Sequence, residues 1–92
     1  MKKLSFKEKK RIKRELKQIE GVKTCKVYKD YIMIYVYDID EAYYDKNSSL
    51  EKFFIREFQD GVCDSYFLFG KKKFESICVD CNYNVIVFDL KE

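Results

Sequence analysis

The chain has 92 residues, of which 47% are hydrophobic, and a formal net charge of +3. This length supports one domain, expected here to span residues 1–92, and the hydrophobic content excludes intrinsic disorder. Histidine is absent, which excludes Ser/His/Asp, Cys/His and two-histidine metal mechanisms, so the chain is predicted not to be an enzyme and to need no cofactor.

The positive charge is concentrated near the N-terminus. Residues 1–20 hold nine Lys or Arg against three Glu, whereas residues 21–92 hold ten Lys or Arg against thirteen Asp or Glu. A basic balance confined to one segment points to a local contact surface for an anionic partner rather than to a uniformly basic protein.

Residues 5–21 are predicted to form one helix. Ser5 and Glu8 have the spacing of a capping box, and Gly21 can supply the left-handed residue that follows a helix end. Apolar side chains recur at i, i+4 and i+7 and form a narrow core-facing stripe: Ile12, Leu16 and Ile19.

Six cations occupy the opposite side of this predicted helix. At about 100° per residue they follow one another around its surface: Lys7, Lys10, Arg11, Lys13, Arg14 and Lys17. Such a face can contact a phosphate backbone, dock on an acidic protein surface, or simply be solvated. Lysine predominates over arginine, so any binding to nucleic acid is expected to be independent of sequence.

A β-hairpin is predicted next, from residues 22–28 and 31–37 across Lys29-Asp30. Its second strand alternates, with aliphatic side chains on one side and Tyr31, Tyr35 and Tyr37 on the other. These tyrosines are candidates for contact with a protein partner, for a homodimer interface or for stacking with bases, or they simply stabilise the strands.

The second half is predicted to contain a helix and three strands. A second capping box, Ser48-Ser49-Leu50-Glu51, predicts a helix that ends before Gly61, with Leu50, Phe53, Phe54 and Phe58 as its buried stripe. Strands are expected at 62–69, 73–79 and 83–90. The predicted fold is α+β, in the order α-β-β-α-β-β-β: a two-layer sandwich with an antiparallel sheet of four or five strands and both helices on one face.

Two further groups of side chains bear on metal binding. Cys78 and Cys81 have the spacing of a zinc knuckle, which Cys25 and Cys63 would complete, although the second close pair typical of zinc sites is missing and inert thiols are favoured. The segment 38–41 (DIDE) is a carboxylate cluster whose Asp38 and Asp40 would share a face if the strand continued through it. An acidic loop is the favoured interpretation.

These features predict a small cytoplasmic binding protein without a membrane segment. It is expected to act as an inhibitor that covers a surface of a larger protein or ribonucleoprotein complex, using the basic helix and the tyrosines. Such an inhibitor would be encoded by a phage or mobile element and directed at a host-defence or nucleic-acid-handling complex, and an anti-CRISPR-like role is one example. The alternative is a sequence-non-specific RNA- or DNA-binding protein that uses the same helix.

Overall fold

The computed structural model describes residues 3–69 and 72–91, which form an α+β fold. One α-helix, α1 (Phe6–Lys17), precedes six strands that pair in a single antiparallel sheet. The strands are β1 (Val22–Val27), β2 (Tyr31–Val36), β3 (Phe54–Gln59), β4 (Val62–Phe69), β5 (Lys72–Asp80) and β6 (Val85–Lys91). Between β2 and β3 lie a π-helical turn, η1 (Asp40–Tyr44), and a 3-10 turn, η2 (Leu50–Phe53).

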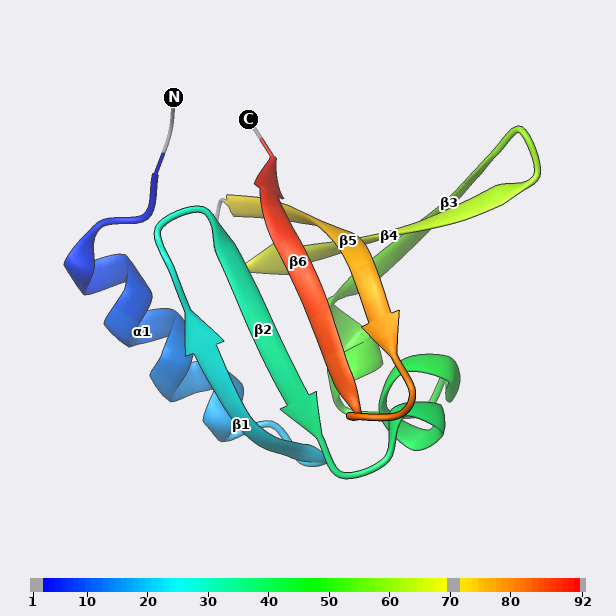
Figure 1. Ribbon diagram of the computed structural model, residues 1–92, viewed down its shortest axis with the longest axis horizontal. Helices are drawn as coiled ribbons and strands as arrows, with labels where there is room; N and C mark the ends of the chain where they lie inside the picture. The colour runs from blue at the N-terminus through cyan, green and yellow to red at the C-terminus, as the bar shows by residue number, and fades with distance from the viewer. Residues whose placement is uncertain (1–2, 70–71, 92) are drawn as a thin grey trace.

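The strand order across the sheet is β1-β2-β6-β5-β4-β3 (Figure 1). Strands β3 to β6 form a meander, and the C-terminal strand β6 inserts beside β2, so the N-terminal hairpin and the meander share one sheet. The predicted α+β class is confirmed. The predicted count of four or five strands and the predicted element order are wrong, because a sixth strand occupies the place of the second helix.

That second helix is replaced by η2 and β3. Asp60 and Gly61 both have positive φ (52° and 81°), the backbone of a two-residue type I′ turn between antiparallel strands. Leu50 is buried as expected, but Phe58 is 79% exposed, so the predicted buried stripe does not form. Asp-Gly therefore turns a hairpin here instead of ending a helix, and Figure 1 shows that hairpin reaching away from the body of the sheet.

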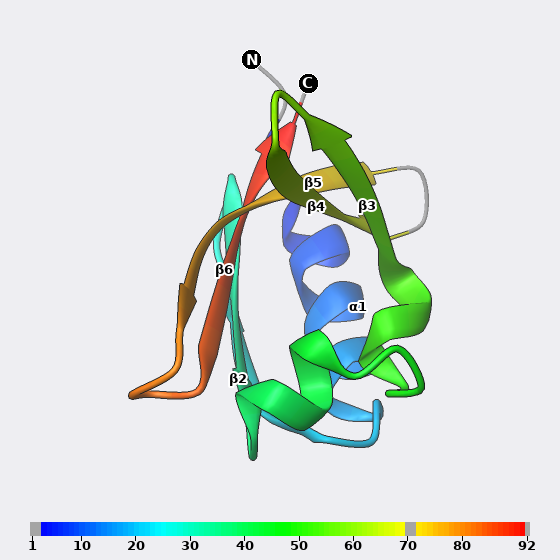
Figure 2. The same cartoon turned by 90° about the vertical axis from the view of Figure 1, so that its right-hand side faces the viewer.

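The sheet has one covered and one uncovered face. Figure 2 shows α1 and the helical turns on the same side of the sheet, with the β3–β4 end curling towards them. Ile32, Ile34 and Val36 of β2 point into this covered side and are buried. The prediction that the alternating residues of this strand separate a core side from an uncovered side is confirmed.

Aromatic rings fill the core beneath the meander. Phe67 of β4 is fully buried, and its ring centroid lies 5.3 Å from that of Phe88 and 6.4 Å from that of Phe74. Phe53 and Phe54 contact the same ring from the η2–β3 junction. Within the described residues, no helix has the length and apolarity that crossing a membrane requires.

Candidate binding surfaces

The helix α1 is fixed to the sheet along its apolar side and at its N-terminus. Ile12 and Leu16 are buried in the core, and the Cys25 thiol of β1 donates to the carbonyl of Lys13 at 3.6 Å. The predicted capping box is present: the Ser5 amide donates to the Glu8 carboxylate (3.0 Å), and the Glu8 amide donates to the Ser5 hydroxyl (3.1 Å). The outer side of the helix is therefore a firmly positioned surface.

That outer side carries all six predicted cations, which we call the basic face. Every one of them is exposed: Lys7, Lys10, Arg11, Lys13, Arg14 and Lys17. Arg11 forms an i,i+4 pair with Glu15 at 3.4 Å. The Glu8 carboxylate is engaged by the cap and by Lys72, whose ammonium lies 3.5 Å away. The helix carboxylates thus leave most of the basic face uncompensated.

A groove runs between the first turns of α1 and the end of β1, and we call it the helix–strand groove. Its volume is about 330 Å³. It is lined by four lysines and two aromatic rings: Lys9, Lys10, Lys13, Lys26, Phe6 and Tyr28. Phe6 belongs there because it lies off the core stripe and is the i−4 neighbour of Lys10, whose ammonium is 4.8 Å from the ring centroid. The groove combines positive charge with apolar rings.

The groove adjoins the tyrosines of the uncovered sheet face. Tyr28 stacks on Tyr31 with ring centroids 4.4 Å apart and an interplanar angle of 17°. The Lys26 ammonium, which lines the groove, lies 5.8 Å from the ring centroid of Tyr35. The basic helix and the tyrosines, which the sequence suggested as two candidate surfaces, are therefore joined at the edge strand β1.

The three predicted tyrosines do not form one patch. Tyr31 and Tyr35 are half-buried on the uncovered face of β2. Tyr37 lies past the end of β2, is exposed, and lines a separate cleft with Glu20 and Asp38. We use the name tyrosine face for Tyr31 and Tyr35 alone.

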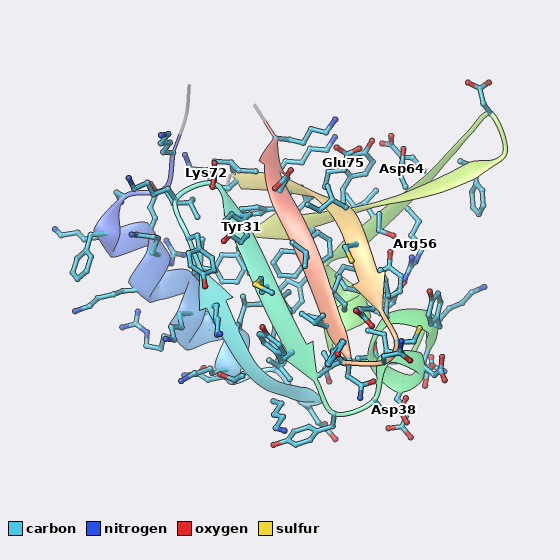
Figure 3. All side chains as sticks on the ribbon, viewed as in Figure 1. Tyr31, Asp38, Arg56, Asp64, Lys72 and Glu75 are labelled. Atoms are coloured by element: carbon cyan, nitrogen blue, oxygen red, sulfur yellow. The ribbon has the colours of Figure 1, made fainter. Side chains whose placement is uncertain are left out.

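The far half of the uncovered face carries more carboxylates than cations. Cross-strand pairing places four carboxylates on it: Glu57, Asp64, Glu75 and Asp89. Lys73 and Lys91 share this face; Lys91 pairs with Glu75 at 3.1 Å, and the Lys73 ammonium lies 4.0 Å from the ring centroid of Tyr66. Tyr66 lies among them, and its burial and the carboxylates of Glu57 and Asp64 raise its pKa above the ordinary tyrosine value. Figure 3 shows Tyr31 towards the helix side of the sheet, and Asp64 and Glu75 towards the other side. The helix end of this face is therefore more favourable for an anionic partner than the meander end.

The cysteines do not come together. Cys25 is buried under α1 and its burial raises its pKa, whereas Cys78 and Cys81 are exposed. Three strand spacings separate β1 from β5, about 14 Å, and the Cys63 side chain lies outside the described residues. Among the described side chains, no three Cys, Asp or Glu groups cluster as metal ligands do. The four-thiolate alternative is wrong, because Cys25 and Cys78 are too far apart to bind one ion.

The acidic segment 38–41 caps a helical turn. Asp38 Oδ1 accepts from the amides of Asp40 (2.9 Å) and Glu41 (3.4 Å) at the start of η1. Because β2 ends at Val36, Asp38 and Asp40 do not alternate along a strand. The segment leaves the sheet, as the favoured interpretation predicted, but its second half belongs to the helical turn η1 and not to a loop.

A polar cluster around Arg56 joins β3 to the helical turns. Its guanidinium donates twice to the Glu51 carboxylate, at 2.9 Å each, once to the Ser65 hydroxyl at 2.7 Å and once to the Tyr43 carbonyl. The Tyr43 hydroxyl donates to Ser65 at 2.6 Å. The Glu51 carboxylate raises the pKa of Arg56 further above its ordinary value. Each of these polar groups has a hydrogen-bond partner within the protein, so the cluster ties β3 and β4 to the helical turns. Arg56 is labelled in Figure 3.

Four residues of the helix–strand groove were not among the predicted contacts: Phe6, Lys9, Lys26 and Tyr28. One signal was readable, because Phe6 is a large aromatic residue that lies off the apolar stripe of an otherwise charged helix. The positions of Lys9, Lys26 and Tyr28 in the groove depend on how α1 packs against β1, and the periodicity of neither element specifies that packing.

Comparison of the chain with protein-family models, with curated proteins and with solved structures finds no match.

Proposed function

We propose that this is a small non-enzymatic binding protein that docks its basic face on a polyanionic surface of a larger macromolecular partner and so blocks that surface. The observation that carries the proposal is the exposure of all six cations on one helix. A solvated helix needs no such concentration of one sign, since mixed charges maintain solubility as well.

Rigid presentation supports the proposal. The buried side chains Ile12 and Leu16 and the capping box hold α1 in place before any partner arrives. Little conformational entropy of the backbone is then lost on binding, so a larger share of the electrostatic attraction appears as affinity.

Occlusion is the mode of action that fits the rest of the molecule. The chain has no histidine, and the one dense polar cluster of the described residues, around Arg56, is satisfied internally. A protein of this size with a preformed cationic surface can inhibit a protein or ribonucleoprotein complex by covering it, as an inhibitor encoded by a phage or mobile element would.

A second candidate function is direct, sequence-non-specific binding of RNA or DNA. It is favoured by the aromatic rings of Phe6 and Tyr28 beside the groove lysines. The two candidates share the basic face and differ in whether the polyanion is an acidic protein surface or nucleic acid.

The basic face is tested by two double variants of equal charge. Arg14→Gln/Lys17→Gln removes two cations of the face outside the groove, and Lys46→Gln/Lys52→Gln removes two exposed lysines near η1 and η2. Fluorescence anisotropy measures binding to a labelled 20-residue polyglutamate peptide, a 12-nucleotide single strand and a 12-base-pair duplex at 50 and 200 mM salt.

We expect Arg14→Gln/Lys17→Gln to bind at least one of these polyanions about tenfold more weakly at 50 mM salt. The salt dependence should also be shallower: for duplex, the slope of log affinity against log salt concentration should decrease in magnitude by about 2. The control variant should change affinity about twofold or less. Equal losses in both variants would show that total charge, not the basic face, determines binding.

A further inference from the structure

The helix–strand groove has the composition of a site for a chain of linked anions with flat apolar groups. Four lysines line it and no carboxylate does. Phe6 is 67% exposed and Tyr28 39% exposed, although each ring has an apolar face that water solvates poorly. The Phe6 ring lies beside Lys10, whose ammonium is 4.8 Å from the ring centroid, and Tyr28 lines the same groove, so the groove offers both charge and stacking surface.

The combination of rings and lysines continues beyond the groove. Tyr28 stacks on Tyr31, and Lys26 lies between the groove and the ring of Tyr35. Rings and ammonium groups therefore form one track from α1 across the edge strand β1 to the tyrosine face. The carboxylate of Asp89, the cross-strand neighbour of Tyr31 on β6, bounds this track on the far side.

Among polyanions, single-stranded nucleic acid matches this track best. Its bases offer π-faces that stack on aromatic side chains, and its phosphates attract lysine. A duplex hides the faces of its bases inside the helix, and an acidic protein surface supplies carboxylates without regularly spaced flat rings. The predominance of lysine over arginine suits contact with phosphates without base readout.

We propose that the helix–strand groove binds unpaired nucleotides of single-stranded RNA or DNA, with bases stacked on Phe6 and Tyr28 and phosphates on the groove lysines. This inference rests on the proposed function, because it takes the basic face to be the contact surface, and it goes further by naming the polyanion. Binding tolerates any base sequence, since every base offers a π-face to stack on an aromatic ring.

The decisive variants change the Phe6 ring and leave every charge in place. Phe6→Leu keeps apolar area and removes the π-face, whereas Phe6→Tyr keeps the π-face. Phe58→Leu is the matched control, because Phe58 is also largely exposed (79%, against 67% for Phe6) but lies on the β3–β4 hairpin. Anisotropy is measured with labelled 12-nucleotide U and dT strands and the 12-base-pair duplex at 50 and 200 mM salt, and circular dichroism verifies the fold of each variant.

We expect Phe6→Leu to weaken binding to both single strands roughly 5- to 100-fold, and binding to duplex about twofold or less. Phe6→Tyr and Phe58→Leu should bind single strands as the unchanged protein does. Comparison of the U and dT strands shows whether RNA or DNA binds more tightly.

Two outcomes overturn the inference and are distinguishable from failure of the proposed function. Phe6→Leu could bind single strands normally while Arg14→Gln/Lys17→Gln binds weakly, which would leave the basic face in place and remove base stacking. Alternatively, the polyglutamate peptide alone could bind, and lose affinity in the double variant, which would make the partner an acidic protein. Absence of binding to all three polyanions at 50 mM salt would remove both proposals.

Discussion

Among the described residues, Arg56 has the side chain that forms hydrogen bonds to the most helices and strands. Its guanidinium contacts Glu51 of η2, Ser65 of β4 and the Tyr43 carbonyl of η1 from its own place on β3. The planar fork is matched bidentately by the Glu51 carboxylate, a geometry that lysine cannot reproduce. Arg56 therefore holds the connection between β2 and β3 against the sheet.

Replacement of Arg56 should be far more costly than replacement of an exposed arginine. We expect Arg56→Ala to lower the free energy of unfolding by roughly 2–4 kcal/mol, because the half-buried Glu51 carboxylate loses its partner and the buried Ser65 hydroxyl loses one of its two. Arg11→Ala, which removes an exposed pair with Glu15, should cost about 0.5 kcal/mol or less. Urea unfolding followed by far-UV circular dichroism measures both, and similar midpoints for the two variants would show that the cluster contributes little.

At the scale of elements, the N-terminal cap of α1 makes the stability of the helix depend on pH. The Ser5 amide donates to the Glu8 carboxylate and holds the pKa of Glu8 below its usual value. A folded pKa below the unfolded one means that the cap stabilises the fold fully above the ordinary glutamate pKa of about 4.3. This stabilisation is lost as the pH falls from there through the lower folded value.

We therefore expect Glu8→Gln to be less stable than the unchanged protein at pH 6, and the difference to shrink at pH 3, below the ordinary glutamate pKa, where the unfolded chain gains a proton that the cap disfavours. Urea unfolding at the two pH values measures the difference. A difference independent of pH would mean that the Glu8 charge does not contribute to the cap.

The turn between β3 and β4 depends on backbone conformation alone. Gly61 has φ of 81°, and a Cβ placed on it would meet no atom within 4 Å, so a substitution there is penalised by its dihedral angles and not by a clash. We expect Gly61→Ala to cost roughly 1–2 kcal/mol of unfolding free energy. Gly61→Asn should cost less, because asparagine tolerates the left-handed region. Equal costs in urea unfolding would contradict a conformational origin.

The same turn explains where the sequence misleads about the fold. Ser48 to Glu51 has the pattern of a capping box, and the Glu51 amide does donate to the Ser48 hydroxyl oxygen at 3.0 Å. The Glu51 carboxylate, however, binds Arg56, and the helix stops after one turn. The hydroxyl half of the predicted capping box is therefore present and its carboxylate half is absent. The Asp-Gly turn and the tertiary partner of Glu51 decide the structure of residues 54–59.

The first helix and the N-terminal hairpin were predictable because their signals are local. The capping box, the apolar stripe and the alternation of β2 each depend on residues within one or two turns or strands. The helix–strand groove was not predictable, since Phe6 and Tyr28, which line it together, come from two different parts of the chain. The periodicity of the helix predicts the basic face, whereas only the packing of α1 against β1 places the aromatic rings beside it.

At the scale of the whole molecule, charge is distributed unevenly between the two ends of the sheet. The basic face lies at the end formed by β1 and β2, whereas towards the other end Glu57, Asp64 and Glu75 share the sheet with the lysines of β5 and β6. This separation orients the protein as it approaches a polyanion, and salt weakens the effect. The surface that first meets the partner is therefore the one that carries the groove.

The two ends of the sheet also raise the question of whether the molecule unfolds as one unit. Phe67 of β4 anchors the aromatic core of the meander, and Cys25 of β1 lies under α1, with β2, β6 and β5 between their strands. The buried thiol of Cys25, whose pKa is raised by its burial, reacts with an alkylating reagent only when the helix end opens.

We expect Phe67→Leu to lower the unfolding free energy by roughly 1–2 kcal/mol, because it leaves a gap among the rings of Phe53, Phe74 and Phe88. If the sheet unfolds cooperatively, alkylation of Cys25 accelerates by the same free energy, about 5- to 30-fold, as measured by mass spectrometry of the Cys25 peptide. Phe58→Leu, which changes an exposed ring, should leave the rate unchanged. Destabilisation by Phe67→Leu without faster alkylation of Cys25 would mean that the helix end opens independently of the meander, and that the basic face keeps its shape when the far end of the sheet is loosened.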